Sequence, residues 1–363
     1  MPKPLARPTL PSSSSIPNTS GSLAPLVVTT HRDTSSFLAA LEGELLQRPI
    51  EANLLLHIAT SAARTEELLV ESSYPNPRHP SCWVSVGTKL PNSGRTKLDF
   101  IAALTSSPIG AYPLFFFPAH RSSVYTAEFT RPRMARLVEA LSRLVPSTRV
   151  FSVFAPKSLA GEFARQWSAT TGHARIVEPY FEAVLTTLTA ETFDDTLVDD
   201  QARQHSRLAT MGDLHEVAAL FDAFADSTGM YPITLQQALL QARVAIQMQS
   251  VWLYELESAG IRRPIGVVAA LRSTPRHAFI TKVFVEEVHR RNGLGKRLVA
   301  WVCEELFDRD FEDVSLYVSE QDNREAAALY DKVGFAGLCG RPRPPHVEEW
   351  VEIAFEGTMK GHW

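Results

Sequence analysis

The chain has 363 residues, of which 45% are hydrophobic, so it can build two domains with apolar cores and is too apolar to be disordered throughout. A formal net charge of −4 and a pI of about 6.3 give no overall attraction to nucleic acid or to an anionic membrane, and we expect neither as a partner. No apolar run approaches the roughly 18 residues of a membrane span. The longest, Ile265–Leu271, has the length of a strand.

The first 25 residues are rich in proline and serine and are predicted to be a disordered tail without the apolar core of a secretory signal. Lys3 and Arg7, without acidic neighbours, leave a mitochondrial location as the alternative to a cytoplasmic one. The three cysteines, Cys82, Cys303 and Cys339, are far apart, and no Cys/His pattern joins them. We therefore expect a reducing compartment, with neither a disulfide framework nor a metal site.

Residues 26–190 are predicted to form an α/β domain, because runs of strand length alternate with runs whose apolar residues recur at helical spacing. In one such helix Met134, Leu137, Leu141 and Leu144 fall on one side. The predicted strands are 26–30, 82–86, 98–104, 112–117, 149–154 and 175–188, and the predicted helices are 34–47, 50–70, 133–144 and 159–171.

A polar, aspartate-rich segment at 191–204 is predicted to be a linker with little to bury, and a second α/β unit follows at 205–357. Its predicted strands are 207–209, 251–256, 265–271, 278–285, 313–318 and 347–355, and its predicted helices are 212–225, 235–248, 295–307 and 323–333. The two units repeat one order of elements, which indicates a duplicated fold with a twisted mixed sheet flanked by helices. The alternative is that any alternating α/β protein shows such an order.

A turn that contains two glycines, Arg290-Arg291-Asn292-Gly293-Leu294-Gly295, joins the predicted strand 279–285 to a helix. A pyrophosphate needs converging N–H donors, and a helix N-terminus supplies unpaired ones with a partial positive charge. Glycines permit positive φ and close approach of a ligand, and Lys296 and Arg297 add positive charge. The alternative is a glycine-rich helix start with solvated arginines. The matching turn of the first unit, at 118–123, has no glycine, so only the second unit is predicted to bind a phosphate.

Motifs in the second unit resemble those of the GNAT superfamily of acyl-CoA-dependent N-acyltransferases, in the family's order and on matching elements. The turn at 290–295 resembles the family's Arg-x-x-Gly-x-Gly signature, and residues 323–335, NREAAALYDKVGF, resemble its Asn-x-x-Ala-x-x-Leu-Tyr-x-x-x-Gly-Phe pattern. Residues 207–213, RLATMGD, are similar to its first strand and helix start. The resemblance covers roughly 205–355 and implies a catalytic GNAT domain there. Residues 51–56, EANLLL, resemble the degenerate halves of tandem members, so 26–190 is expected to be a degenerate GNAT-like domain.

This resemblance implies transfer of an acetyl or other short acyl group from acyl-CoA to a primary amine, by direct attack of the amine within a ternary complex. Acetyl-CoA or another acyl-CoA is the implied co-substrate, and no metal is implied. Backbone amides of the turn are expected to hold the pyrophosphate, and the backbone of the central strand is expected to pair with the pantetheine arm where the sheet splays. The implied acyl-CoA site consists of Val283, Val285, Arg290, Arg291, Asn292, Gly293, Leu294, Gly295, Lys296, Asn323 and Tyr330.

Catalytic roles follow from the same resemblance. Tyr330 is the expected general acid, because a phenol stays protonated at pH 7 and can donate to the departing thiolate; the alternative is an ordinary buried tyrosine. Asn323 is expected to cap its helix as well. Where family members often carry a carboxylate base, this chain has Phe279. Glu286 and Glu287 are the nearest carboxylates and the tentative bases, with a solvated loop pair, or water as the base, as the alternatives.

The acceptor is predicted to enter beside the segment 224–234, with Asp226, Tyr231 and the turn at Gly229 lining or covering the amine site. It can be a small-molecule or a protein amine, and neither its identity nor the oligomeric state follows from the sequence. A non-catalytic acyl-CoA-binding regulatory or scaffold protein is the alternative function. A dinucleotide-binding domain is excluded, because its glycine loop follows the first strand of a βαβ unit, whereas this turn follows a late strand.

Overall fold

The computed structural model describes residues 25–69, 81–91, 93–107, 110–229, 231–258, 260–359 and 361–362. The predicted tail at 1–25 lies outside this part of the chain except for Pro25. The elements of the first half are β1 (Leu26–His31), α1 (Thr34–Leu45), α2 (Asn53–Leu69), β2 (Cys82–Lys89), β3 (Thr96–Ser107), β4 (Gly110–Pro118), α3 (Ala127–Leu144), β5 (Ser152–Pro156), α4 (Lys157–Thr171) and β6 (Phe181–Thr189).

The second half repeats this order after a short connecting helix, α5 (Asp200–His205). It contains β7 (Ser206–Leu208), α6 (Leu214–Thr228), α7 (Leu235–Gln247), β8 (Val251–Ser258), β9 (Ile261–Ala269), β10 (His277–Phe279), β11 (Lys282–Val285), α8 (Leu294–Phe307), β12 (Asp313–Val318), α9 (Arg324–Val333) and β13 (Glu348–Ala354). The mixed α/β class and the duplicated order that the sequence predicts are therefore confirmed.

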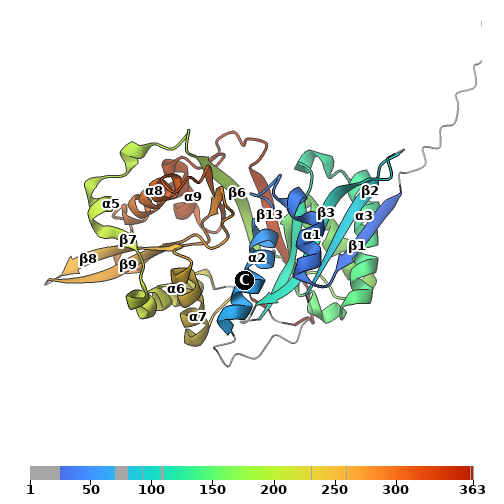
Figure 1. The fold of residues 1–363 in the computed structure, drawn as a ribbon, viewed down its shortest axis with the longest axis horizontal. Coiled ribbons are helices and arrows are strands. Elements are labelled where there is room, and N and C mark those ends of the chain that lie inside the picture. The colour runs from blue at the N-terminus through green and yellow to red at the C-terminus, as the bar shows by residue number, and fades with distance from the viewer. Residues whose placement is uncertain are drawn as a thin grey trace, which may run out of the picture.

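The two halves exchange their last strands. We expected one sheet per unit, but the strands form a nine-stranded sheet with the order β1-β2-β3-β4-β5-β13-β6-β12-β10, and a four-stranded sheet β11-β9-β8-β7. β13, from the end of the chain, pairs with β5 of the first half, while β6 pairs with β12 of the second. Figure 1 shows β6 and β13 running between the two halves. Backbone hydrogen bonds therefore join the halves into one structure.

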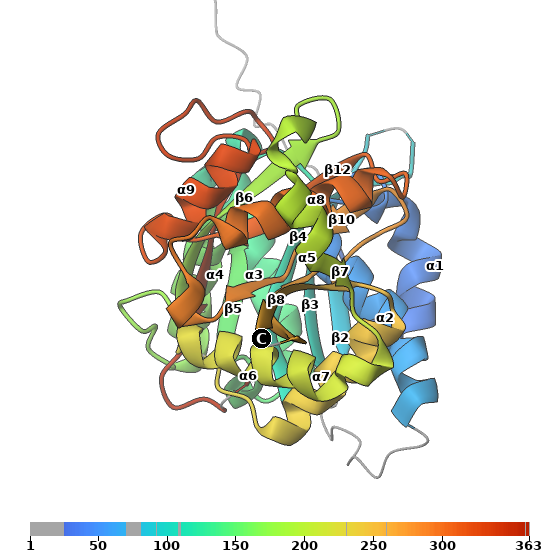
Figure 2. The same ribbon diagram turned by 90° about the vertical axis from the view of Figure 1, so that its left-hand side faces the viewer.

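Helices cover both faces of this sheet. The core under α1 and α2 includes Phe154, Trp350 and Phe279, which come from β5, β13 and β10. α3 and α4 pack on the opposite face of the first half, and α8 and α9 pack on that same opposite face of the second half. α6 and α7 cover the four-stranded sheet. Figure 2 shows α1 and α2 on one side and α4 and α9 on the other.

The strand predicted at 278–285 is interrupted and changes its neighbour. β10 pairs with β12 from His277 to Phe279, while β11 pairs with β9 from Lys282 to Val285. At the break the Ile280 amide donates to β12 and the Thr281 amide donates to Ala269 of β9. Because Lys282 also lies opposite Ala269, one extra residue is accommodated there as a bulge, which bends the strand away from β12.

The segment predicted as a linker is partly structured. Asp199 caps α5 by accepting from the Ala202 amide, and Ala202 is fully buried. Arg203 forms a bidentate ion pair with Glu304 of α8, with both distances 2.7 Å. The segment thus packs along α8, which a pattern of aspartates does not reveal. No helix in the described part of the chain is long and apolar enough to cross a membrane, and no group of three or more potential metal ligands occurs among those residues.

Candidate acyl-CoA and acceptor sites

One edge of β11 is covered by no strand in the described part of the chain. Its ladder partner is β9, and β12 pairs with β10 and β6 instead. The Glu286 amide donates to Ile265 of β9. Since successive amides of a strand point to opposite sides, those of Val283 and Val285 point away from β9, toward the side where the sheet opens. The two residues expected to pair with an added strand therefore carry outward-pointing amides.

The turn after β11 leads into an uncapped helix. Arg291 and Gly293 have φ values of 65° and 75°, and Gly293 stands at the N-cap of α8 without a side-chain cap. The first amides of α8, at Leu294, Gly295 and Lys296, therefore lack the oxygen that a serine or aspartate cap supplies. Arg297 holds the turn from behind: its Nη1 donates to the Asn292 carbonyl at 3.0 Å, and its Nε donates to Asp199 at 2.7 Å.

The basic side chains around this turn have different surroundings. Arg290 donates to the Val285 carbonyl at 2.9 Å and lies 5.3 Å from the ring centre of Phe284. Arg291 is exposed and lies 3.5 Å from Glu325 of α9. Lys296 is half-buried in the first turn of α8. Arg290 thus stabilises the end of β11, while Arg291 and Lys296 add positive charge near the helix start.

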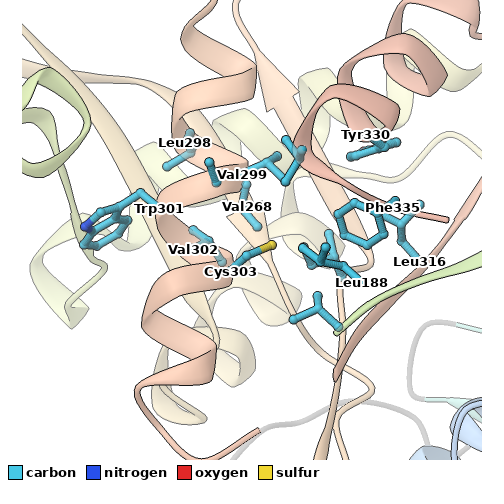
Figure 3. Close-up of a cluster of buried hydrophobic side chains, with 14 of the residues drawn as sticks. Leu188, Val268, Leu298, Val299, Trp301, Val302, Cys303, Leu316, Tyr330 and Phe335 are labelled. Carbon is cyan, nitrogen blue, oxygen red and sulfur yellow. The ribbon is translucent and has the colours of Figure 1, made fainter. Parts of the chain in front are cut away.

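Gly295 allows α8 to pack closely against its neighbours. A Cβ built there would lie 3.0 Å from Leu329 of α9 and 3.8 Å from Val285. Figure 3 shows the core below this contact, in which Leu298, Val302 and Cys303 of α8 share one buried cluster with Phe335 and Tyr330. The helix that starts at the turn is therefore fixed by a buried apolar core.

Asn323 and Tyr330 both lie on α9. The Asn323 side chain accepts from the Ala326 amide at 3.0 Å, so the predicted helix cap is confirmed. The Tyr330 side chain is 8% exposed, and its ring lies 5.6 Å from that of Phe335. Burial raises the pKa of Tyr330, and Cys303 adds to the shift, so the phenol is protonated at neutral pH.

The carboxylates predicted as tentative bases lie at the end of β11. The Glu286 carboxylate accepts two hydrogen bonds from Arg263, at 2.7 and 2.5 Å. Glu287 is exposed, and His289 lies 3.8 Å from Glu286. Phe279, at the position where the family often has a carboxylate, is 3% exposed and packs 5.2 Å from the ring of Tyr317. The Glu286 carboxylate is thus engaged with Arg263, and both carboxylates stay predictions for the base.

The segment predicted to cover the amine site reaches across to β13 and β5. Tyr231 donates to Glu352 of β13 at 2.5 Å, and Ser152 of β5 donates to the same carboxylate oxygen at 2.5 Å. Glu352 is 0% exposed, and its other oxygen has no partner among the described residues. Burial raises the pKa of Glu352 to about 7. Asp226 is exposed near the end of α6, and Gly229 ends that helix with φ 68°.

A cationic cluster lies near the bulge on the side of the sheet that α2 and α6 cover. Lys282 lies 5.0 and 5.4 Å from the ring centres of Phe224 and Phe221 of α6. Burial, and to a lesser degree the charge of Arg272, lowers the pKa of Lys282 to about 8. Arg272 also acts on His57 of α2, whose pKa is lowered to about 3, first by burial. Groups from both halves of the chain therefore meet here.

Lys282, Arg272 and Glu352 are candidate functional residues that pattern reasoning missed. Lys282 and Glu352 each interrupt an apolar strand, and a charged residue in a strand covered on both faces is a signal for a buried charge. Arg272 lies in a loop, where a single arginine carries no such signal.

Together, the open strand edge and the uncapped helix start form the kind of backbone arrangement that suits an extended ligand bearing a pyrophosphate. Residues 217–335 match the model of the acetyltransferase (GNAT) family, so this part of the chain is a GNAT domain. The comparison with curated proteins found no match.

Solved structures resemble the chain beyond this domain. A Drosophila protein matches with a TM-score of 0.56 at 15% identity, over 92% of this chain and 99% of that one. A tandem GNAT protein from the clavulanic acid biosynthesis pathway has a TM-score of 0.49 at 14% identity, over 93% and 100%. A GCN5-related N-acetyltransferase from Sphaerobacter thermophilus has a TM-score of 0.46 at 13% identity, over 91% and 95%. The first of these likenesses extends the shared fold across both halves.

Proposed function

We propose that the chain is an N-acyltransferase that moves an acetyl or other short acyl group from acyl-CoA to a primary amine. The observation that carries this proposal is the pairing of the open edge of β11 with the uncapped start of α8, inside a GNAT domain. The pantetheine arm would add to β11 as a short strand through Val283 and Val285, and the pyrophosphate would accept from the amides of residues 291–296.

In this proposal the amine attacks the thioester carbonyl directly while both substrates are bound. A new N–C bond forms, the C–S bond breaks, and the thiolate takes a proton from Tyr330. The burial of Tyr330 supports this role, because a phenol with a raised pKa is protonated before the step. Asn323, at the start of the same helix, is proposed to contact the pantetheine arm. Glu286 and Glu287 stay predictions for the base.

A second candidate function is non-catalytic acyl-CoA binding. It is favoured by the apolar Phe279 at the position of a family carboxylate and by the ion pair that ties Glu286 to Arg263. Both candidates predict acyl-CoA binding, so they differ only in turnover.

The deciding experiment measures release of the CoA thiol from acetyl-CoA in the presence of a panel of primary amines, with Tyr330→Phe as the comparison. N-acyltransferase activity predicts amine-dependent thiol release that is strongly reduced in the variant. Acetyl-CoA binding without amine-dependent release from any member of the panel would favour the non-catalytic function. Absence of acyl-CoA binding would reject both.

A further inference from the structure

Lys282 occupies a distinctive place in the sheet. It is the first residue of β11, directly after the bulge where the strand parts from β12. Its ammonium lies over two rings of α6, so its side chain is directed to the face covered by α2 and α6, opposite to the face that α8 covers. The side chain is half-buried. A cation therefore stands beside the point where the sheet opens.

Arg272 provides a second positive charge at the same point. It follows β9, whose last residue, Ala269, is the ladder partner of Lys282. The next residue, Ser273, accepts from the Phe279 amide at 3.2 Å and so anchors the loop to β10. The Arg272 guanidinium is close enough to lower the pKa of the Lys282 ammonium.

Polar groups of both halves complete the cluster. The charge of Arg272 also interacts electrostatically with Tyr112 of β4, with Tyr317 of β12 and with His57 of α2. Asn53, at the start of α2, lies 3.4 Å from the Tyr317 hydroxyl. The cluster therefore lies at the junction of the two halves, and neither half would form it alone.

No carboxylate balances the charge of Lys282 within the described residues. It takes part in no ion pair there, and Arg272 is the one charged group that shifts its pKa. Asp226 of α6, predicted to line or cover the amine site, is exposed and does not shift the pKa of Lys282. Burying one cation beside another disfavours the charged forms of both, and a bound anion would offset that cost.

We propose that Lys282, with Arg272 beside it, binds a carboxylate carried by one of the two substrates, either the amine acceptor or the acyl group. This inference rests on the proposed acyl transfer, because it places the carboxylate next to the thioester. An amino acid is the simplest acceptor of this kind, and a dicarboxylic acyl group is the simplest donor.

The positive charges also bear on the missing base. The positive charge of Lys282 beside the acceptor amine lowers the pKa of that amine and favours its neutral form. Water can then take the proton that leaves the amine nitrogen, while the N–C bond forms and the thiolate takes its proton from Tyr330. A carboxylate at the position of Phe279 is not needed in such a site.

The test measures thiol release for several amino acids, each paired with its α-amide, and for acetyl-CoA against succinyl-CoA. The test compares wild type with Lys282→Met, Lys282→Arg and a control, Arg262→Met. Arg262 is an exposed arginine on β9 that pairs with Glu257. If the acceptor carries the carboxylate, wild type prefers acids over amides by about tenfold or more, since a charge-assisted contact contributes roughly 1.5–3 kcal/mol. If the acyl group carries it, succinyl-CoA is preferred by a similar factor.

Lys282→Met is expected to abolish whichever preference is found, mainly through KM, while Lys282→Arg restores part of it and Arg262→Met changes nothing. Equal rates for acids and amides together with equal rates for the two acyl-CoAs would overturn the proposal. So would a preference that Lys282→Met leaves intact.

A binding measurement separates this proposal from the proposed activity. N-acetylglycine and N-acetylglycinamide are titrated calorimetrically at pH 8 in two buffers of different ionisation enthalpy, and N-succinylglycinamide, whose carboxylate lies on the acyl side, is titrated in the same way. Because the pKa of Lys282 is about 8, a bound carboxylate should draw a fraction of a proton onto Lys282 in wild type but not in Lys282→Met. Such uptake without any turnover would uphold the site and reject the acyltransferase. Equal binding of all three ligands without proton uptake would reject the site.

Discussion

The same turn of the fold, from the fourth strand of each half to the next helix, is closed in the first half and open in the second. In the first half Thr126 caps α3 by accepting from the Phe129 amide, and Glu128 lies in the first turn. In the second half Gly293 leaves α8 uncapped, with no acidic residue in the first turn. An acidic, capped helix start has fewer free amides and a weaker positive field for a phosphate, so the two halves differ in how well this turn can bind one.

The first half uses its turn for internal contacts instead. His120 lies 3.0 Å from Asp99, Arg133 of α3 donates to Asp99 at 2.7 Å, and Thr88 donates to it at 2.6 Å. Burial opposes ionisation of Asp99, and the three hydrogen bonds outweigh that effect, so its pKa is lowered. The matching turns of one topology thus differ: the first stabilises the fold through internal contacts, and the second is proposed to bind a ligand.

The largest effect is expected from breaking the closed turn. Asp99→Asn leaves Arg133 without its buried counter-charge and should lower the free energy of unfolding by about 3–5 kcal/mol. Urea unfolding at pH 7 measures this, and Glu139→Gln on α3, which removes exposed ion pairs, should cost under about 1 kcal/mol. A small loss in Asp99→Asn would contradict the structural role of the network.

The next effect concerns Glu352, a buried carboxyl that forms no ion pair within the described residues. Its folded pKa is raised from 4.5 to about 7, so its contribution to stability is present below pH 4.5 and is lost as the pH rises through 7. Glu352→Gln should therefore remove a pH-dependent loss of up to about 3 kcal/mol between pH 5 and pH 8.

Asp99 behaves in the opposite sense, because its folded pKa is lowered: its contribution is present above its ordinary pKa and is lost in acid. Thermal unfolding across pH 3–8 separates the two groups. An unchanged alkaline limb in Glu352→Gln would contradict titration of Glu352 between pH 5 and pH 8.

Tyr330→Phe tests whether α9 carries a catalytic residue that the matching helix α4 lacks, since α4 has no tyrosine. Loss of a general acid should lower kcat by about 100-fold and leave acetyl-CoA affinity nearly unchanged. Tyr254→Phe, at another buried tyrosine of the same half, serves as the control and should keep full activity. Wild-type turnover in Tyr330→Phe would remove the proposed role.

The smallest effect is expected at Asn292, which is exposed in the open turn. Asn292→Asp adds one negative charge near the start of α8 at almost constant shape and should weaken acetyl-CoA binding about two- to fivefold, more at low salt. Gln236→Glu, at the exposed start of α7, adds the same charge elsewhere and should leave binding unchanged. Equal affinities in the two variants would argue against a pyrophosphate at this turn.

Local features could be predicted from the sequence, and long-range pairing could not. The bounds of β12, 313–318, and the cap at Asn323 follow from local pattern and side-chain chemistry. The exchange of β6 and β13 does not, because both are central strands, and an apolar pattern does not specify which neighbour a strand pairs with. The bulge before Lys282 and the contact of Tyr231 with Glu352 likewise depend on tertiary packing.

The central claim is that one half of this duplicated fold binds acyl-CoA and the other does not. Calorimetric titration with acetyl-CoA tests it most directly, on wild type, on Gly293→Asp and on Gly161→Asp, where an added side chain in α4 meets open space. The account predicts one site per chain, lost in Gly293→Asp, because the aspartate is strained at φ 75° and repels the pyrophosphate, and retained in Gly161→Asp. Two sites per chain, none, or unchanged affinity in Gly293→Asp would contradict it.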